Sequence, residues 1–484
     1  MLFNSWSYVV FLALAVALHW ALPQRLRIHL LAVMSLAFYA CWRLDFVALM
    51  VFSACVDFVA ARRIAAARGG TRARLWLWTS LSINVGLLVF FKYTYFLYDN
   101  AHVAGGLLGF ELAPLQDLGL RIILPLGISF YTFQTISYTI DVFRGAIQPV
   151  RSFASFLTYV TFWPQLVAGP ILRAGEVIPQ LERPRRLRAG DASAGLLLVL
   201  SGLFKKVVIA DHLAPIVDLA FAADAASLTV FNVWGAACLF GFQIYFDFSG
   251  YSDIAIGSAR LCGIRFPRNF DWPYLARSPQ EFWRRWHISL SAWIRDYLYL
   301  PLIRRRGGEE SRGGIEVATT QGGRNAARFC VWFVMGLWHG ASWTFAVWGL
   351  YHATVIYAYR SVPVLRTLPE KAPRVAWGLF FVVAMLGWIP FRAQSLGQTG
   401  ALFSAFFDPT RYDFHDRLLR TEQHLIWLAL LLGMLTLRTA SHLTPRLSIP
   451  RPLAWAATCT AVALATALLT IFLEPTTQFL YFQF

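Results

Sequence analysis

Long apolar blocks, separated by shorter polar connections, follow one another along almost the whole chain. A helix needs about 20 consecutive apolar residues to cross the hydrocarbon core of a bilayer. The pattern predicts membrane-spanning helices at 6–22, 29–42, 43–61, 75–97, 121–142, 193–215, 230–249, 329–341, 343–359, 375–391, 424–437 and 453–473. We therefore expect an all-α, polytopic integral membrane protein of about 11–13 helices, folded as one domain over residues 1–484.

Basic residues gather in every second connection. The connections that hold 34 of the 43 Lys and Arg residues are 23–28, 62–74, 143–192, 250–328, 360–374 and 438–452. Positively charged loops remain in the cytoplasm, so both termini are predicted to face the periplasm or the exterior. The first apolar run, Tyr8 to Leu22, follows an uncharged start and lacks a small-residue cleavage pattern, which favours a span over a signal peptide.

Composition narrows the function classes. Only 14% of the residues are charged, whereas soluble proteins carry about 25%. The net charge of +17 is spread over the connections, which indicates a basic surface against anionic lipid rather than a nucleic-acid site. Six scattered cysteines lack metal-ligand spacing, so no metal site is expected. The absence of a P-loop, GxSxG, HExxH or dinucleotide motif argues against an NTPase, serine hydrolase or metalloprotease.

One apolar segment does not fit the pattern in which successive connections lie on opposite sides of the membrane. Residues 152–170 have basic neighbours before and after them, so both flanks are predicted to be cytoplasmic. Pro164, Gly169 and Pro170 would interrupt a helix. Irregular backbone at membrane depth is tolerated where protein or a cavity covers it. The segment is therefore predicted to be a re-entrant element that lines a cytoplasmic cavity.

Residues 280–301 predict an amphipathic helix with an aromatic face. That face carries Phe282, Trp286, Leu290, Trp293 and Tyr297. The opposite face carries Arg284, His287, Ser291 and Arg295. Such a helix suits the cytoplasmic interface of the membrane; a plain surface helix with tryptophan anchors is the alternative.

His339 is the first candidate for chemistry, because a histidine at bilayer depth is costly and by default functional. Desolvation favours the neutral imidazole, which can accept a proton. Gly336 and Gly340 would let another backbone or a substrate approach closely. The alternative is a neutral imidazole that hydrogen-bonds between helices. His352, near the end of the next predicted span, is expected to be structural or interfacial.

Carboxylates near membrane depth are the second candidates. Asp247 and Asp253 lie in YFDFSGYSD, and Asp211 follows Lys205 and Lys206 in LFKKVVIAD, where an intramembrane ion pair is expected. A second pair, Asp141 and Arg144, lies one helical turn apart. These pairs are expected to fix helix packing; on their own they do not separate an enzyme from a proton-coupled transporter.

Seven stretches together resemble the membrane-bound O-acyltransferase family, in its bacterial branch that O-acetylates exopolysaccharides. They are LPLGISFYTFQTISYTIDVFRG (124–145), FWPQLVAGPILR (162–173), KKVVIAD (205–211), IYFDFSGYSDIAIG (244–257), RNFDWPYLARSPQEFWRRWHISLSAWIRDYLYLPL (268–302), GLWHGASWTFAVWG (336–349) and FLYFQF (479–484). FYACWRLDF (38–46) is also similar to that branch.

The resemblance implies helices arranged around a thin central pore in the inner membrane, with His339 and His287 as the family's two histidines. It implies transfer of an acyl group, here from acetyl-CoA as a substrate rather than a bound cofactor, to a periplasmic acceptor protein that acetylates the polysaccharide. On this basis the donor and substrate contacts are expected to be Arg173, Arg284, Arg285, Trp283, Trp286, Trp338 and Asn269. A supporting polar network is expected from Asp211, Asp247, Asp253 and Arg324.

Two alternatives stay open. One is D-alanyl transfer to teichoic acid, in which a carrier protein supplies the thioester. The other is a proton-coupled transporter, although no inverted repeat is visible in the sequence. The polar stretches 303–328, cytoplasmic and with six arginines, and 392–423, external, are predicted to be loops.

Overall fold

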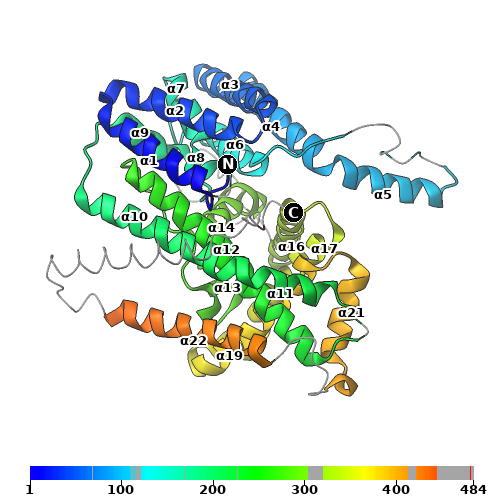
Figure 1. Ribbon diagram of the computed structural model, residues 1–484. Coiled ribbons are helices and arrows are strands. Elements are labelled where there is room, and N and C mark those ends of the chain that lie inside the picture. The colour runs from blue at the N-terminus through cyan, green and yellow to red at the C-terminus, as the bar shows by residue number, and fades with distance from the viewer. Residues whose placement is uncertain are drawn as a thin grey trace. The chain divides into compact units, whose positions relative to one another are not determined.

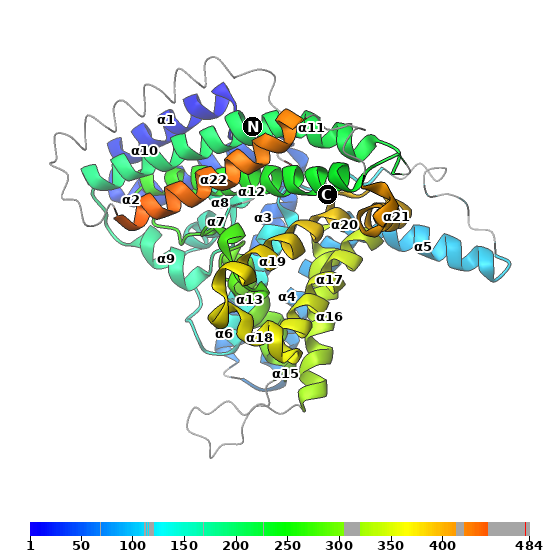
Figure 2. The same cartoon turned by 90° about the horizontal axis from the view of Figure 1, so that it is seen from below.

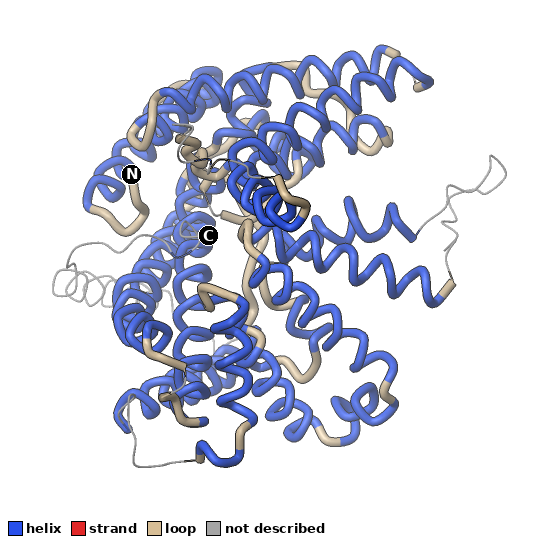
Figure 3. The backbone as a smooth tube through the Cα atoms, turned by 90° about the vertical axis from the view of Figure 1, so that its right-hand side faces the viewer, coloured by secondary structure: helices blue, strands red, loops and turns tan. Residues whose placement is uncertain are grey.

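The computed structural model describes residues 1–67, 69–110, 113, 115, 121–167, 169–225, 227–303, 320–412, 421–443 and 480. Every regular element in these residues is a helix, and Figure 3 shows helices joined by loops, so the all-α class is confirmed. The chain divides into two compact units. The first is Met1–Val199 with Tyr251–Pro267, and the second is Leu200–Gly250 with Arg268–Phe484. The single domain over 1–484 stays a prediction.

The first unit is built mainly from N-terminal helices. They are α1 (Trp6–Ala21), α2 (Gln24–Ala40), α3 (Asp45–Ala66), α4 (Gly70–Leu88), the π-helix η1 (Val89–Tyr93), α5 (Thr94–Leu107), α6 (Ile128–Phe143), α7 (Phe153–Thr161), α8 (Trp163–Leu166) and α9 (Ala174–Glu182). Within this unit α2 packs on α7, and α3 packs on both α4 and α6 (Figure 1). The unit boundary falls within α10 (Ala189–Leu203) and α12 (Val230–Leu261).

The second unit holds the remaining helices. They are the π-helix η3 (Phe204–Ala210), α11 (Asp211–Ala222), η4 (Pro273–Leu275), α13 (Pro279–Trp283), α14 (Ile288–Ile294), the π-helix η5 (Arg295–Tyr299), α15 (Leu300–Ile303), α16 (Gln321–His339), α17 (Trp343–Ser361), α18 (Pro363–Lys371), α19 (Pro373–Leu386), α20 (Trp388–Arg392), α21 (Leu396–Phe407), η6 (Pro409–Arg411) and α22 (Thr421–Leu443). The helices α16 and α17 lie side by side (Figure 2), and α17 also packs on α13, α18 and α20.

Three described helical segments are long and apolar enough to cross a membrane: Gly70–Leu107, Ala189–Ala222 and Pro373–Arg392. Trp6–Ala21 and Leu425–Leu435 are apolar but shorter. Most other predicted windows also form helices, but these are shorter or carry charged residues, as α12 does with Asp247, Asp253 and Arg260. The predicted window 453–473 lies outside the described residues.

The predicted interruption of residues 152–170 is present, although Pro164 does not cause it. The helix α7 ends before Phe162, whose backbone is extended at ψ 110°, and Pro164 lies in the first turn of α8, where proline fits. Gly127, at φ +72°, starts α6, and a side chain there would overlap the carbonyl oxygen of Leu166. The segment is buried against α6, and its re-entrant path stays a prediction.

The single helix predicted over 280–301 is wrong. His287 adopts a left-handed conformation at φ 41° and separates α13 from α14. The cause is a contact with a distant segment: the N–H of Ile288 donates to the carbonyl of Asn269 at 2.9 Å, and the N–H of Asp271 donates to the carbonyl of Arg285 at 2.9 Å. The predicted aromatic face is nevertheless buried along its full length.

Two predicted loops contain helix. The helix α16 begins at Gln321, inside the predicted loop 303–328, because Thr320 accepts a hydrogen bond from the N–H of Gly323 and caps it. Residues 304–319 of that loop lie outside the described residues. The helix α21 occupies part of 392–423, where Ser395 caps its first turn in the same way.

Candidate active site

His339 is the last residue of α16, and its side chain is buried. The helix ends there because Gly340 adopts an extended backbone, and Ser342 then caps the start of α17. Three aromatic rings surround the imidazole: Trp338 and Trp348 at 4.9 Å between ring centroids, and Phe391 at 5.5 Å. The imidazole of His339 therefore lies in an apolar, aromatic environment at the end of α16.

Two glycines let α16 and α17 cross closely beside His339. A Cβ at Gly336 would overlap the carbonyl oxygen of Phe345, and one at Gly349 would overlap the carbonyl oxygen of Trp332. The expected close backbone is present at Gly336, where it is that of α17, whereas the close neighbour of Gly340 is the side-chain ring of Phe345. This crossing places Trp348 against His339.

His287 is held by Asn269, and the hydrogen bonds identify its tautomer. The side-chain oxygen of Asn269 accepts from the backbone N–H of Ser289 at 3.3 Å, and it lies 3.2 Å from Nδ1 of His287. A backbone N–H is always a donor, so this Asn269 atom is the acceptor oxygen and Nδ1 must carry the proton. Nε2 therefore carries the lone pair. Burial lowers the pKa of His287 to about 3, so the ring is neutral at working pH.

Ring contacts within the second unit connect the surroundings of the two histidines. His287 packs against Phe248 and Phe270, and Phe270 packs against Trp286 at 5.2 Å. Trp286 then lies 4.9 Å from Trp388, which contacts Phe391 beside His339. The predicted residues His287, His339 and Trp286 thus belong to one continuous aromatic cluster, and Asn269 is hydrogen-bonded to His287.

Trp283 and His352 lie on the other side of Trp348. Trp283 contacts Trp348 at 5.9 Å and His352 at 5.0 Å. His352 is itself 4.9 Å from Trp348, so this tryptophan contacts both His339 and His352. The expectation of a structural role for His352 fits its tight aromatic packing. Among the described residues, the indole N–H groups of Trp283 and Trp348 have no hydrogen-bond acceptor.

The arginines predicted to contact the donor differ in their surroundings. Arg285 forms hydrogen bonds to Glu281 at 2.8 and 3.2 Å and to the carbonyl of Asp271, so its guanidinium is engaged in holding α13 to the 269–271 segment. Arg284 is exposed, and among the described residues no hydrogen bond or ion pair is assigned to it. Arg173 belongs to the first unit. Its grouping with Arg284 stays a prediction.

The predicted ion pair near Asp211 is present and larger than expected. Nζ of Lys206, in η3, lies 2.7 Å from Asp211 and 2.6 Å from Asp247 of α12. The second oxygen of Asp247 accepts a hydrogen bond from the N–H of Leu480 at 2.8 Å. Lys206 thus joins η3, α11 and α12 of the second unit through charges that are buried or partly buried.

The grouping of Asp253 and Arg324 with this network stays a prediction. Asp253 is half-buried on the part of α12 that belongs to the first unit. Arg324 donates to Gln321 in the first turn of α16, about 22 Å along the helix axis from His339.

Trp348, Trp388, Phe391 and Phe270 were not singled out from the sequence, although they build the walls around the two histidines. Trp348 had a usable signal, because it lies four residues before His352 and therefore on the same helix face. Phe270 and Phe391 come from distant segments, and no local pattern marks them.

Comparison with known proteins identifies the family. Residues 146–396 match the model of the membrane-bound O-acyltransferase family. The chain is 38% identical over 409 residues to the probable alginate O-acetylase AlgI of Azotobacter vinelandii, covering 84% of this chain and 78% of that protein. It is 37% identical over 394 residues to the peptidoglycan O-acetyltransferase of Helicobacter pylori, covering 76% of this chain and 71% of that protein.

A more distant similarity is to the teichoic acid D-alanyltransferase of Streptococcus thermophilus, at 30% identity over 293 residues, covering 55% of this chain and 68% of that protein. The matched stretches include the segments that carry both histidines, since the family model extends over the whole of 146–396. The chain belongs to the membrane-bound O-acyltransferase family, and it is an acyltransferase of the membrane.

Proposed function

We propose that the protein transfers acetyl groups from a cytoplasmic thioester, acetyl-CoA, toward a cell-envelope polysaccharide on the other side of the inner membrane. The relatives named above act on alginate and peptidoglycan, which are both polysaccharide-containing polymers. An acceptor protein in the periplasm would pass the acetyl group on to sugar hydroxyls. Both chain termini would face the periplasm, as the distribution of basic residues favours.

The proposed chemistry centres on His339 as general base. Its neutral imidazole accepts the proton of the incoming hydroxyl while the hydroxyl oxygen attacks the thioester carbonyl. A new C–O ester bond forms, the C–S bond breaks, and the imidazolium returns its proton to the leaving thiolate. A correctly placed base accelerates such reactions by about 100- to 10,000-fold. Burial excludes bulk water, which would otherwise hydrolyse the thioester.

The observation that carries this proposal is the burial of His339 against Trp348 and Phe391 at the end of α16. A buried polar group normally has a hydrogen-bond partner, and a described group without one calls for a ligand or water. The indole N–H of Trp348, beside His339, is such a group among the described residues. A substrate carbonyl oxygen would supply the missing acceptor.

His287 would assist through its lone-pair nitrogen, Nε2, which Asn269 fixes by holding the proton on Nδ1. Arg284 would contact donor phosphates, because its guanidinium is exposed and its planar donors match phosphate oxygens. Arg173 would share that role. Arg285 is a positioning residue, since its donors are already engaged with Glu281.

The donor is tested with the purified full-length chain in lipid nanodiscs. We expect release of the coenzyme A thiol from acetyl-CoA when the acceptor protein is supplied, and transfer of radiolabelled acetyl to that acceptor. A D-alanyl-loaded carrier protein should give no transfer. Transfer from the carrier with none from acetyl-CoA would instead support the teichoic acid reaction of the more distant relative. Proton movement without any acyl transfer would support the transporter alternative.

The tautomer of His287 predicts a specific pH dependence. In the Asn269→Asp variant a carboxylate replaces the neutral amide 3.2 Å from Nδ1 and stabilises the imidazolium, so the pKa of His287 rises from its value of about 3. The neutral ring is then present only above the raised pKa. We therefore expect the variant's transfer rate to fall toward acid between pH 8 and 5.5 more steeply than the wild-type rate.

The measurement compares full pH profiles of transfer for both proteins. Every ionisable group of the wild type is also present in the variant, so a difference between the profiles reports the altered contact between position 269 and His287. The exposed Arg268→Gln change, one residue before Asn269, controls for local disturbance of the segment. Superimposable profiles for wild type and Asn269→Asp would remove the proposed role of the Asn269 contact.

A further inference from the structure

A hollow of about 960 Å³ in the first unit is lined by an unusual concentration of arginine. The segment after α9 supplies Arg183, Arg185, Arg186 and Arg188, and Arg27 of α2 and Arg265 complete the set. Only one carboxylate, Asp191, faces the six guanidinium groups among the described lining residues. None of these residues has a part in the proposed acetyl transfer.

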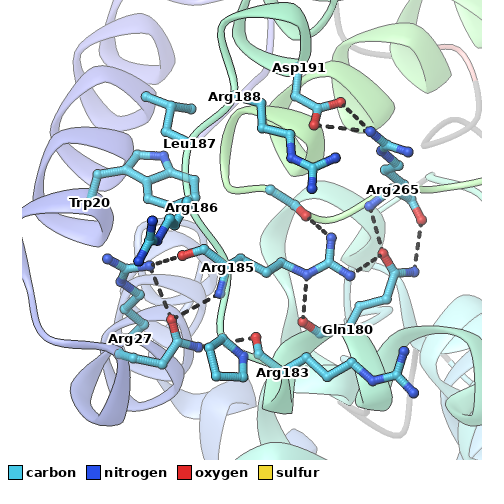
Figure 4. A pocket seen from close by; sticks show the side chains of 13 residues that line it. Trp20, Arg27, Gln180, Arg183, Arg185, Arg186, Leu187, Arg188, Asp191 and Arg265 are labelled. Carbon is cyan, nitrogen blue, oxygen red and sulfur yellow. Dashed lines mark hydrogen bonds and ion pairs between the residues drawn. The ribbon is translucent and has the colours of Figure 1, made fainter.

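Two of the six arginines build the frame of the pocket. Arg185 donates to the backbone and side chain of Gln180 and to the carbonyl of Gly263. Arg27 donates to the carbonyl of Arg185 at 2.9 Å and lies over the ring of Trp20. These contacts, drawn in Figure 4, fix the 183–188 segment against α2 and the end of α12.

The single carboxylate is already neutralised. Asp191 lies 3.1 Å from Arg260 and 2.9 Å from Arg265, so two guanidinium groups share its charge. The charges of Arg183, Arg186 and Arg188 are therefore left without an acidic counterpart in the pocket. Among the described residues no hydrogen bond or ion pair is assigned to the side chains of these three exposed arginines.

Positive charges therefore face one another across the hollow. In Figure 4 the guanidinium groups of Arg185 and Arg188 extend toward Arg265. Burial, followed by the nearby charge of Arg265, lowers the pKa of Arg185, and Arg183 and Arg188 act in the same direction. Like charges held together in this way are relieved when an anion binds among them.

The position of the pocket indicates where that anion comes from. The 183–188 segment immediately precedes Ala189–Ala222, which is long and apolar enough to cross a membrane, and Trp20 lies at the end of the apolar helix α1. A membrane crossing by Ala189–Ala222 would put the pocket at the membrane surface, where tryptophan is common. Leu187, exposed between two of the arginines, offers an apolar contact suited to a lipid rather than to a soluble ion.

We propose that this arginine pocket binds the phosphate groups of an anionic phospholipid at the membrane surface. Arginine binds phosphate oxygens through two parallel N–H donors, and basic pockets beside membrane helices recognise multiply charged headgroups. Arg183, Arg186 and Arg188 supply the contacts, while Arg27 and Arg185 hold the segment in place. A lipid with two phosphate groups, such as cardiolipin, matches this charge best.

The test uses the full-length protein in detergent and measures lipid binding by native mass spectrometry. The probes are cardiolipin, the singly charged phosphatidylglycerol and the zwitterionic phosphatidylcholine, with inorganic pyrophosphate as the soluble competitor. The pocket variant is Arg183→Gln/Arg186→Gln/Arg188→Gln. Its matched control is Arg72→Gln/Arg74→Gln/Arg366→Gln, which removes two exposed arginines at the start of α4 and one on α18, all on the same predicted side of the membrane.

We expect cardiolipin to bind the wild type and the control with dissociation constants that agree within about twofold. The pocket variant should bind it at least about tenfold more weakly, because each arginine near the surface contributes to the attraction. Phosphatidylcholine should not saturate. Pyrophosphate binding through the same arginines, without a preference for anionic lipid, would retain the phosphate site and overturn the lipid as its ligand. Equal weakening in both triple variants, or none in either, would overturn the proposal.

Discussion

The His339→Ala variant is expected to lose acetyl transfer by about 100- to 10,000-fold while accumulating in the membrane at normal levels. The loss follows from the proposed chemistry, because the variant lacks the imidazole that accepts the proton of the incoming hydroxyl. A water molecule in the space left by the ring would be a far weaker base. The readout is ester-linked acetate on the secreted polysaccharide, released by alkali and quantified.

Two further variants separate chemistry from packing. His339→Gln keeps much of the side-chain volume against Trp348 and Phe391 but cannot act as a base, so it should be as inactive as His339→Ala. His102→Ala replaces an exposed histidine on α5 and should retain full acetylation. Normal acetate content in the His339→Gln strain would show that the ring fills space and nothing more.

Replacement of Lys206 by methionine is expected to cause a large loss of stability. The ammonium group lies within 2.7 Å of two carboxylates, the buried one of Asp247 and the partly buried one of Asp211. Removal of the lysine takes the ammonium group away from these two negative charges, and breaking a buried ion pair in this way costs about 3–5 kcal/mol. The variant should therefore melt at a lower temperature in detergent and reach lower levels in the membrane.

The same network provides its own rescue. The variant Lys206→Met/Asp211→Asn/Asp247→Asn removes all three charges, and exchange of a complete buried ion pair for neutral groups is often close to neutral in stability. We expect the triple variant to recover most of the lost melting temperature. The control Lys371→Met replaces an exposed lysine of α18 and should leave the melting temperature unchanged. If Lys206→Met alone melted at the wild-type temperature, the proposed ion pairs of Lys206 with Asp211 and Asp247 would not contribute to stability.

Local sequence patterns were sufficient to predict helices whose backbone hydrogen bonds are made within the helix and its own caps. The apolar windows around 6–22 and 343–359 correspond closely to α1 and α17, because their boundaries are set by local caps at Ser5 and Ser342. The ion pair of Lys206 with Asp211 was expected from their closeness in the sequence, and the π-helix η3 brings these residues, five positions apart, to the same side of the helix.

Long-range contacts explain the failures. The helical pattern of 280–301 is regular, yet the pairing of the 269–271 segment with 285–288 breaks it at His287. No spacing rule reveals that pairing. The same holds for Leu480, whose N–H reaches Asp247 from more than two hundred residues away, and for Phe391, which lies beside His339 through the packing of α17 on α20.

The most direct measurement is a single-turnover experiment on purified His339→Gln in nanodiscs, with donor affinity measured in the same samples. Titration gives the Kd for acetyl-CoA, and rapid quenching gives the rate of acetyl transfer to the acceptor. A base that acts only in the reaction predicts an unchanged Kd, within about twofold, and a transfer rate lower by at least about 100-fold. A Kd weakened by the same factor as the overall activity, with an unchanged transfer rate at saturation, would contradict it and make His339 a binding residue.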